Sequence, residues 1–211
     1  MVTAQNFLLY LCTDRILSLG RPITEAVEAA IAGGVTMVQL REKEVSTGEF
    51  YRIALDVRTV TRHHHVPLVI NDRLDIALAV SAEGLHIGQS DLPLSVARRL
   101  AGNRLFIGFS ASTVEEARRA QAEGANYLGV GAVYPTGSKA DAGEAIGLNR
   151  LAEICAAVNI PVVGIGGINA ANAAEVMKTG AAGIAVISGI LSKPDIQDAA
   201  RNLRVIVNET L

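Results

Sequence analysis

Two acidic residues follow two short apolar runs of the chain and could together hold a metal ion. Asp72 comes directly after residues 66–71, and Asp91 comes four residues after residues 84–87. Such runs are typical of strands buried on both faces, and in a barrel of parallel strands the carboxyl ends meet on one face. We therefore expect the two carboxylates to share that face and to bind Mg²⁺ together with phosphate oxygens, while Asn71 adds a neutral hydrogen bond. Taken singly, either acid could instead cap a helix.

A basic pair follows another apolar run, at residues 39–43. Side chains alternate along a strand, so Gln39, Arg41 and Lys43 should point into the mouth of the barrel. Leu40 and Glu42 should then point elsewhere. An arginine beside a lysine suits a diphosphate, because arginine forms bidentate hydrogen bonds and lysine acts as a point charge. The alternative is a charged run that only meets solvent.

Two later parts of the chain predict a second anion site. Residues 164–169 and 186–189 are rich in glycine, and the loops after the last two strands of such barrels frequently bind phosphate through backbone N–H groups. Residues 134–144 carry hydroxyls, glycine and a lysine, which suits a mobile anion-binding flap. These glycines could also serve tight turns alone. If they bind phosphate, the site receives two phosphorylated small molecules.

The strand ends offer no Ser-His-Asp or Cys-His arrangement, so no protein nucleophile is expected. His86 lies within a predicted strand, and we interpret it as a core or supporting residue rather than a catalyst. Cys12 and Cys155 lack metal-ligand spacing and are interpreted as reduced core thiols, which favours the cytoplasm.

Composition limits the partners. The chain has 211 residues, of which 50% are hydrophobic, and a formal net charge of -2. We expect one domain over residues 1–211, with no nucleic-acid partner and no membrane span. The sequence does not fix the oligomeric state and is compatible with a homo-oligomer.

The elements that must position these residues alternate along the chain. Apolar runs predict strands at residues 7–12, 35–40, 67–71, 84–87, 105–109, 127–133, 161–165 and 183–187, with helices between them. This pattern predicts an α/β protein, a single (β/α)8 TIM barrel. A doubly wound sheet is less consistent with it, because no dinucleotide-type glycine turn follows a strand and polar groups follow most strands.

Helix ends are also marked. Glycines at four helix-to-strand junctions predict left-handed helix stops: Gly34, Gly84, Gly124 and Gly180. Thr113 with Glu116 three residues later predicts a capping box at the start of a helix.

Taken in order, five segments resemble the motifs of the thiamine-phosphate synthase family: residues 38–43 (VQLREK), 70–73 (INDR), 86–91 (HIGQSD), 135–139 (PTGSK) and 164–168 (GIGGI). The resemblance implies a (β/α)8 barrel, a transferase of thiamine biosynthesis. Such an enzyme joins hydroxymethylpyrimidine diphosphate to thiazole phosphate with Mg²⁺ and releases diphosphate.

The resemblance also implies site residues. The pyrimidine diphosphate would be bound by Gln39, Leu40, Arg41, Glu42, Lys43, Asn71, Ser110 and Lys139, of which Arg41, Lys43, Ser110 and Lys139 would be catalytic. The thiazole phosphate would be held by Thr136, Gly137, Ser138, Gly167, Ile187 and Ser188. The Mg²⁺ ligands would be Asp72 and Asp91.

Two positions depart from the family pattern, and two rival functions remain. Ser112 stands where members often have histidine, and Ala182 where they often have aspartate. A thiazole tautomerase of the same fold would not need the diphosphate and metal groups, which this chain has. A non-catalytic sensor of phosphorylated metabolites is the other alternative.

Overall fold

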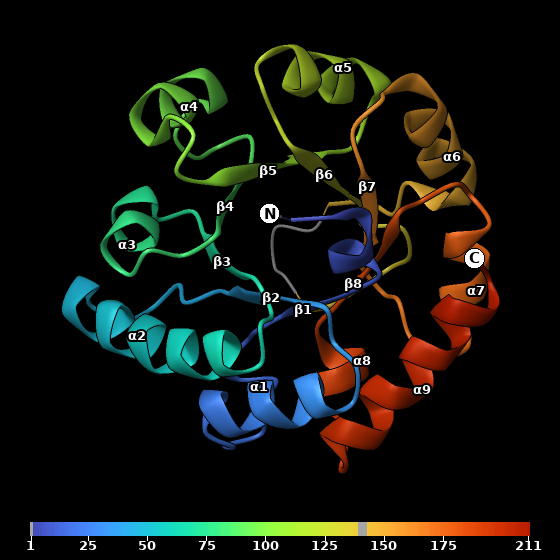
Figure 1. Cartoon of the computed structure of the whole chain (residues 1–211). Coiled ribbons are helices and arrows are strands. Elements are labelled where there is room, and N and C mark those ends of the chain that lie inside the picture. The colour runs from blue at the N-terminus through green and yellow to red at the C-terminus, as the bar shows by residue number, and fades with distance from the viewer. Residues whose placement is uncertain (1, 139–142) are drawn as a thin grey trace.

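Eight parallel strands close into a barrel inside a ring of helices (Figure 1). The computed structural model describes residues 2–138 and 143–211. Each strand pairs with the next, and β1 pairs with β8 to close the barrel. The strands are β1 (Leu9–Cys12), β2 (Met37–Leu40), β3 (Leu68–Asn71), β4 (Gly84–Ile87), β5 (Phe106–Ala111), β6 (Tyr127–Val130), β7 (Val162–Ile165) and β8 (Gly183–Val186). The predicted (β/α)8 barrel is confirmed, and the doubly wound sheet is wrong.

The helices cover the barrel with one apolar face each. They are η1 (Ala4–Phe7), α1 (Ile23–Ala32), α2 (Thr47–His63), α3 (Leu74–Ala79), α4 (Leu94–Ala101), α5 (Val114–Ala122), α6 (Gly147–Ala157), α7 (Ala173–Met177), α8 (Ser188–Leu191) and α9 (Ile196–Glu209). In α9 the buried residues Ile196, Ala200, Leu203 and Val207 recur at helical spacing. Within the described part of the chain, every helix is too short or too polar to cross a membrane.

The predicted strands coincide with the observed ones apart from their ends. Residue 7 was expected in a strand but closes the short helix η1. The sixth strand ends at Val130 rather than at residue 133. There the backbone turns to pair with the end of β7, where the N–H of Val133 donates to the carbonyl of Ile165 at 2.9 Å. Strand β5 runs on to Ala111, so Ser110 lies within it.

Three of the four predicted helix stops have the left-handed backbone: Gly34, Gly124 and Gly180. The prediction is wrong for Gly84, which begins β4; after α3 it is Ser81 that has a positive φ, of 53°. Gly84 is needed for another reason. A Cβ there would lie 2.6 Å from the ring of Phe106, so the glycine makes room for an aromatic side chain.

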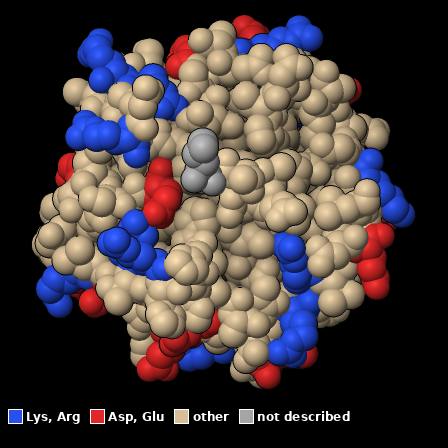
Figure 2. Space-filling model, viewed as in Figure 1, with Lys and Arg blue, Asp and Glu red and all other residues tan. Residues whose placement is uncertain are grey.

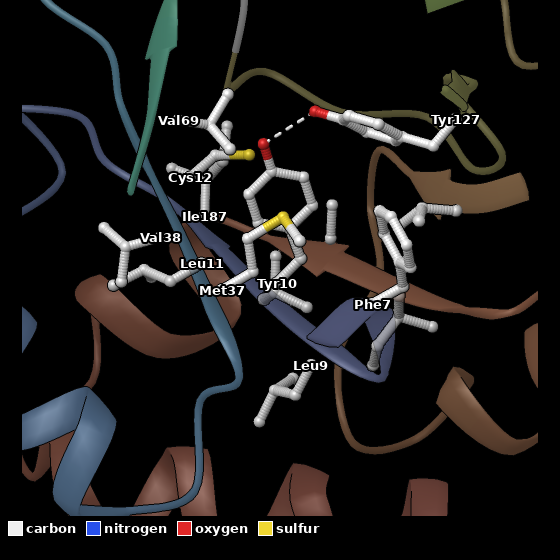
Figure 3. Packing of buried hydrophobic residues seen from close by; sticks show 14 of the residues in the cluster. Phe7, Leu9, Tyr10, Leu11, Cys12, Met37, Val38, Val69, Tyr127 and Ile187 are labelled. Carbon is white, nitrogen blue, oxygen red and sulfur yellow. Dashed lines mark hydrogen bonds between the residues drawn. The ribbon is translucent and has the colours of Figure 1, made fainter. Parts of the chain in front are cut away.

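Aromatic side chains fill the barrel interior below the strand ends. Tyr10 on β1 and Tyr127 on β6 are both almost fully buried, and their hydroxyls are 2.9 Å apart (Figure 3). Because β1 and β6 are not neighbours in the barrel, the two side chains meet across its interior. The ring of Phe7 lies 5.1 Å from that of Tyr127. These packed aromatic side chains form the part of the core that lies inside the barrel.

Candidate active site

A cavity of about 750 Å³ opens where the strands end, lined by residues that follow β2 to β8. Active sites of such barrels lie at this end. The cavity faces away from the viewer in Figures 1 and 2, which show the end of the barrel where the strands begin and where the N-terminus lies. Arg41, Lys43, Asp72 and Asp91 line the cavity on the side of β2 to β4, whereas the described lining residues at β7 and β8 carry no charge, so the cavity has a charged half and a neutral half.

Two carboxylates meet in the charged half. Asp72 and Asp91 both line the cavity and lie close enough to interact. Burial, and then the neighbouring Asp72, raises the pKa of the Asp91 carboxyl, although the Gly88 N–H donates to Asp91 Oδ2 at 2.7 Å. Two like charges held together at a partly buried place favour a bound cation. The helix-cap alternative is wrong, because α3 and α4 begin after Arg73 and Pro93 without a side-chain cap.

This donor set fits a hard divalent ion such as Mg²⁺. Carboxylate oxygens are its preferred protein ligands, and it usually keeps several water or phosphate oxygens as well. Over residues 2–138 and 143–211, no group of three or more His, Cys, Asp or Glu side chains could hold a metal. The acidic pair therefore offers a partial site that phosphate oxygens of a substrate would complete.

The two basic residues after β2 point into the same half. Lys43 Nζ lies 2.5 Å from Asp72 Oδ2, and Arg41 Nη1 lies 3.2 Å from Asp14 Oδ2. The Arg41 N–H also donates to the Thr13 hydroxyl at 3.0 Å. Sequence reasoning missed Asp14, although it follows the first strand by two residues and the same strand-end argument applies to it. Asp14 therefore holds the Arg41 guanidinium at the cavity by an ion pair.

Of the five residues 39–43, only Arg41 and Lys43 line the cavity. Leu40 is fully buried in the core, and Glu42 is paired with Arg15 at 3.2 Å, as side-chain alternation predicts for both. Burial raises the pKa of the Glu42 carboxyl. Gln39 is buried under the cavity floor, where its Nε2 donates to the Tyr10 hydroxyl at 2.8 Å. Gln39, Leu40 and Glu42 therefore do not line the cavity, although all three were predicted to bind the pyrimidine diphosphate.

Asn71 and Ser110 line the cavity as expected, and Ser110 has a partner that was not foreseen. Ser110 Oγ lies 3.0 Å from Nε2 of His86, which is 7% exposed and forms part of the cavity floor. Ser112, one of the two departures from the family pattern, also lines the cavity. Its hydroxyl donates to the Glu116 carboxylate at 2.9 Å, so Glu116 is hydrogen-bonded at the start of its own helix, α5.

The neutral half is built from hydroxyls and glycine, and the charged side chains of Glu144 and Arg150 line the cavity beside it. Thr136, Ser138, Gly167, Ile187 and Ser188 all line the cavity. Ser138 Oγ donates to Ser188 Oγ at 3.2 Å, which joins the chain after β6 to the start of α8. Gly167 has a φ of 66°, and a Cβ there would lie 2.7 Å from the Cβ of Tyr134, so only glycine fits.

Two predicted site residues of the chain after β6 are not in the described cavity wall. Gly137 does not line the cavity. Lys139 lies outside the described residues, as do residues 140–142 of the expected flap. Ala182, the second departure from the family pattern, is also away from the cavity, so it does not alter the wall.

Comparison with known proteins decides the family. Residues 9–190 match the model of a family described as thiamine monophosphate synthase. The chain belongs to this family. A thiamine-phosphate synthase of Clostridium tetani is 53% identical over 95% of this chain and 96% of its own length. One from Ruminiclostridium cellulolyticum is 52% identical over 97% of both chains.

A solved structure agrees with the family assignment. Thiamine phosphate pyrophosphorylase from Pyrococcus furiosus is 44% identical, has a TM-score of 0.91, and covers 99% of this chain and 98% of its own. The resemblance found in the motifs is thereby confirmed, as is the prediction of a transferase of thiamine biosynthesis. The two halves of the cavity can therefore be compared with the two substrates expected for this family.

Proposed function

We propose that the chain joins hydroxymethylpyrimidine diphosphate to thiazole phosphate, giving thiamine phosphate and diphosphate. The observation that supports this most is the division of one cavity into two halves, with an acidic pair beside cations in one and hydroxyls with glycine in the other. A diphosphate with its metal suits the charged half. A monophosphate suits the neutral half, because hydroxyl and backbone N–H groups bind phosphate oxygens.

In the charged half, the chain stabilises the leaving group. Arg41 and Lys43 donate hydrogen bonds to the departing diphosphate and neutralise charge that grows as the carbon–oxygen bond breaks. Asp72 and Asp91 would hold Mg²⁺, which when bound supplies positive charge to the same phosphate oxygens. Ser110 binds the pyrimidine diphosphate, and we propose that Lys139 does so as well.

No general base is required for the coupling. The pyrimidine-methyl cation left by the diphosphate is stabilised by the amino group of its own ring, and the thiazole nitrogen that captures it carries no proton. Catalysis then reduces to charge stabilisation and alignment of the two partners. Thr136, Gly137, Ser138, Gly167, Ile187 and Ser188 would hold the thiazole phosphate.

The test is an incubation of the purified protein with both substrates and Mg²⁺, followed by measurement of diphosphate. We expect diphosphate and thiamine phosphate only when both substrates and the metal are present. A tautomerase would instead consume a thiazole isomer alone, and a sensor would release nothing. Either result would overturn the proposal. Location in the cytoplasm and the absence of a nucleic-acid partner stay predictions from composition.

A further inference from the structure

A line of hydrogen bonds crosses the barrel interior and ends at the active site. Gln39 Nε2 donates to the Tyr10 hydroxyl at 2.8 Å, and the Tyr10 and Tyr127 hydroxyls are 2.9 Å apart (Figure 3). Tyr127 is in turn 2.9 Å from His86 Nδ1, and His86 Nε2 is 3.0 Å from Ser110 Oγ. The line starts in the buried core and reaches a hydroxyl in the cavity wall.

The direction of the line is set by the Nε2 atom of Gln39, which contacts Tyr10, whereas the acceptor Oε1 of the same side chain has no hydrogen-bond partner among the described residues. An amide N–H cannot accept, so the Tyr10 oxygen accepts from Gln39 and the single Tyr10 proton is free to go to Tyr127. If Tyr127 accepts from Tyr10, it donates its own proton to His86 Nδ1. Burial raises the pKa of both phenols, so both keep their protons. With Nδ1 accepting, the imidazole carries its proton on Nε2 and donates it to Ser110.

Two glycines, Gly108 and Gly129, lie against the rings of this line, where a larger side chain would not fit. A Cβ on Gly108 would lie 2.1 Å from Cζ of Tyr127, and a Cβ on Gly129 would lie 3.0 Å from Cε1 of His86. Both glycines have ordinary backbone angles. They are therefore required by the rings that lie over them, not by the turn of the chain.

We propose that Tyr10, Tyr127 and His86 are positioning residues that turn the Ser110 hydroxyl so that its hydrogen points into the cavity. Ser110 then donates to a substrate atom with a lone pair, such as a ring nitrogen or phosphate oxygen of the pyrimidine diphosphate. The choice of substrate rests on the proposed function above, whereas the direction of the line does not.

The first experiment reads the tautomer of His86 in the substrate-free protein by ¹⁵N–¹H correlation of the imidazole rings, with His86→Gln to assign the signal. We expect the proton on Nε2. A proton on Nδ1 would mean that the line runs the other way, with Ser110 accepting, and would overturn the proposal. Because no substrate is present, this result stands even if the wild-type protein releases no diphosphate, which is how failure of the proposed function would appear.

The second experiment compares Tyr127→Phe with Thr61→Val. Thr61 is a matched control, since its buried hydroxyl donates to the Arg58 carbonyl at 3.2 Å in α2, away from the cavity. Both variants should lower the melting temperature. Only Tyr127→Phe should move the His86 proton toward Nδ1 and lower kcat about tenfold, as expected for one lost hydrogen bond, with the KM for thiazole phosphate unchanged.

A Tyr127→Phe variant that is destabilised but keeps both the tautomer and kcat would overturn the proposal, because the hydroxyl would then be structural only. If that variant does not fold, Tyr10→Phe takes its place. It keeps the Tyr127 hydroxyl but removes the proton that orders it, so the same changes are expected at smaller size. If Tyr10→Phe left both the His86 tautomer and kcat unchanged, the proposal would also be overturned.

Discussion

At the residue scale, each described basic side chain that follows β2 into the cavity is held by a carboxylate. Arg41 is paired with Asp14 and Lys43 with Asp72, and the Arg41–Asp14 pair is only 14% exposed on each side. Breaking a partly buried pair by removing one partner costs more than the pair contributes, because a charge is left uncompensated. The two pairs therefore hold both cations beside the cavity.

Removal of Asp72 tests this charge arrangement. We expect Asp72→Ala to lower kcat/KM about 100- to 1000-fold with the fold intact, because the variant loses a proposed metal ligand and leaves Lys43 without its partner. Lys139→Ala should have an effect of similar size. The measurement is diphosphate release alongside far-UV circular dichroism. Asp75→Ala is the control, since Asp75 lies three residues away, pairs with Arg73 and is outside the cavity. Near-normal turnover of Asp72→Ala would show that Asp72 is not a metal ligand.

Sequence reasoning could predict the strand-end residues but not their partners inside the barrel. Alternation along a strand is local, so it gave the outward Leu40 and Glu42 and the inward Arg41 and Lys43 correctly. Contacts across the barrel join residues far apart in the sequence. Tyr10 and Tyr127 are 117 positions apart, and no period in the chain relates them. Likewise His86 could be predicted as a core or supporting residue, but not as the partner of Ser110.

At the element scale, the strands were predictable because buried parallel strands are short continuous apolar runs. Their ends were not, since pairing with neighbours determines where a strand stops. Ala111 belongs to β5 because it pairs with Val130, and residue 7 leaves the first strand because the chain turns there into η1. The predicted stop at Gly84 failed because glycine also serves close packing, which a local pattern does not distinguish from a left-handed turn.

The start of α5 provides a test of local helix signals. The predicted capping box is confirmed: Thr113 Oγ1 accepts from the Glu116 N–H at 3.1 Å, and the Glu116 carboxylate accepts from the Thr113 N–H at 3.2 Å. We expect Thr113→Ala to lower the free energy of unfolding by about 1 kcal/mol, measured by urea denaturation. Thr113→Ser keeps the hydroxyl and should recover most of the loss. Equal losses in both variants would show that the hydroxyl is not what stabilises the helix.

Strand β5 provides a test of the packing around the hydrogen-bonded line. Gly108→Ala would drive a methyl group into the Tyr127 ring, which lies between other rings and cannot move freely. We expect it to lower the free energy of unfolding by about 1–3 kcal/mol. Gly48→Ala is the matched control. Gly48 lies in α2 with open space around it, so alanine there should stabilise the protein by about 0.5–1 kcal/mol. A harmless Gly108→Ala would mean that the ring has room to shift.

At the scale of the whole molecule, the first and last elements are joined. Strand β1 pairs with β8, with Tyr10 opposite Ala185, and α1 packs against α9. The contact between the two helices is close, because a Cβ on Gly33 would lie 2.3 Å from the Gln197 carbonyl oxygen. Closure of the barrel therefore joins the first and last strands in one sheet.

We therefore propose that residues 1–211 form one domain, and we expect it to unfold in a single cooperative transition. The chain has no tryptophan and four tyrosines, of which Tyr10 and Tyr127 are buried in the barrel interior. Tyrosine fluorescence therefore reports largely on the inside of the barrel, whereas far-UV circular dichroism reports mainly on the surrounding helices. In urea the two signals should give the same midpoint and the same slope. Separate midpoints would reveal a subdomain, because the helices could then melt while the strands and their central phenols stayed packed.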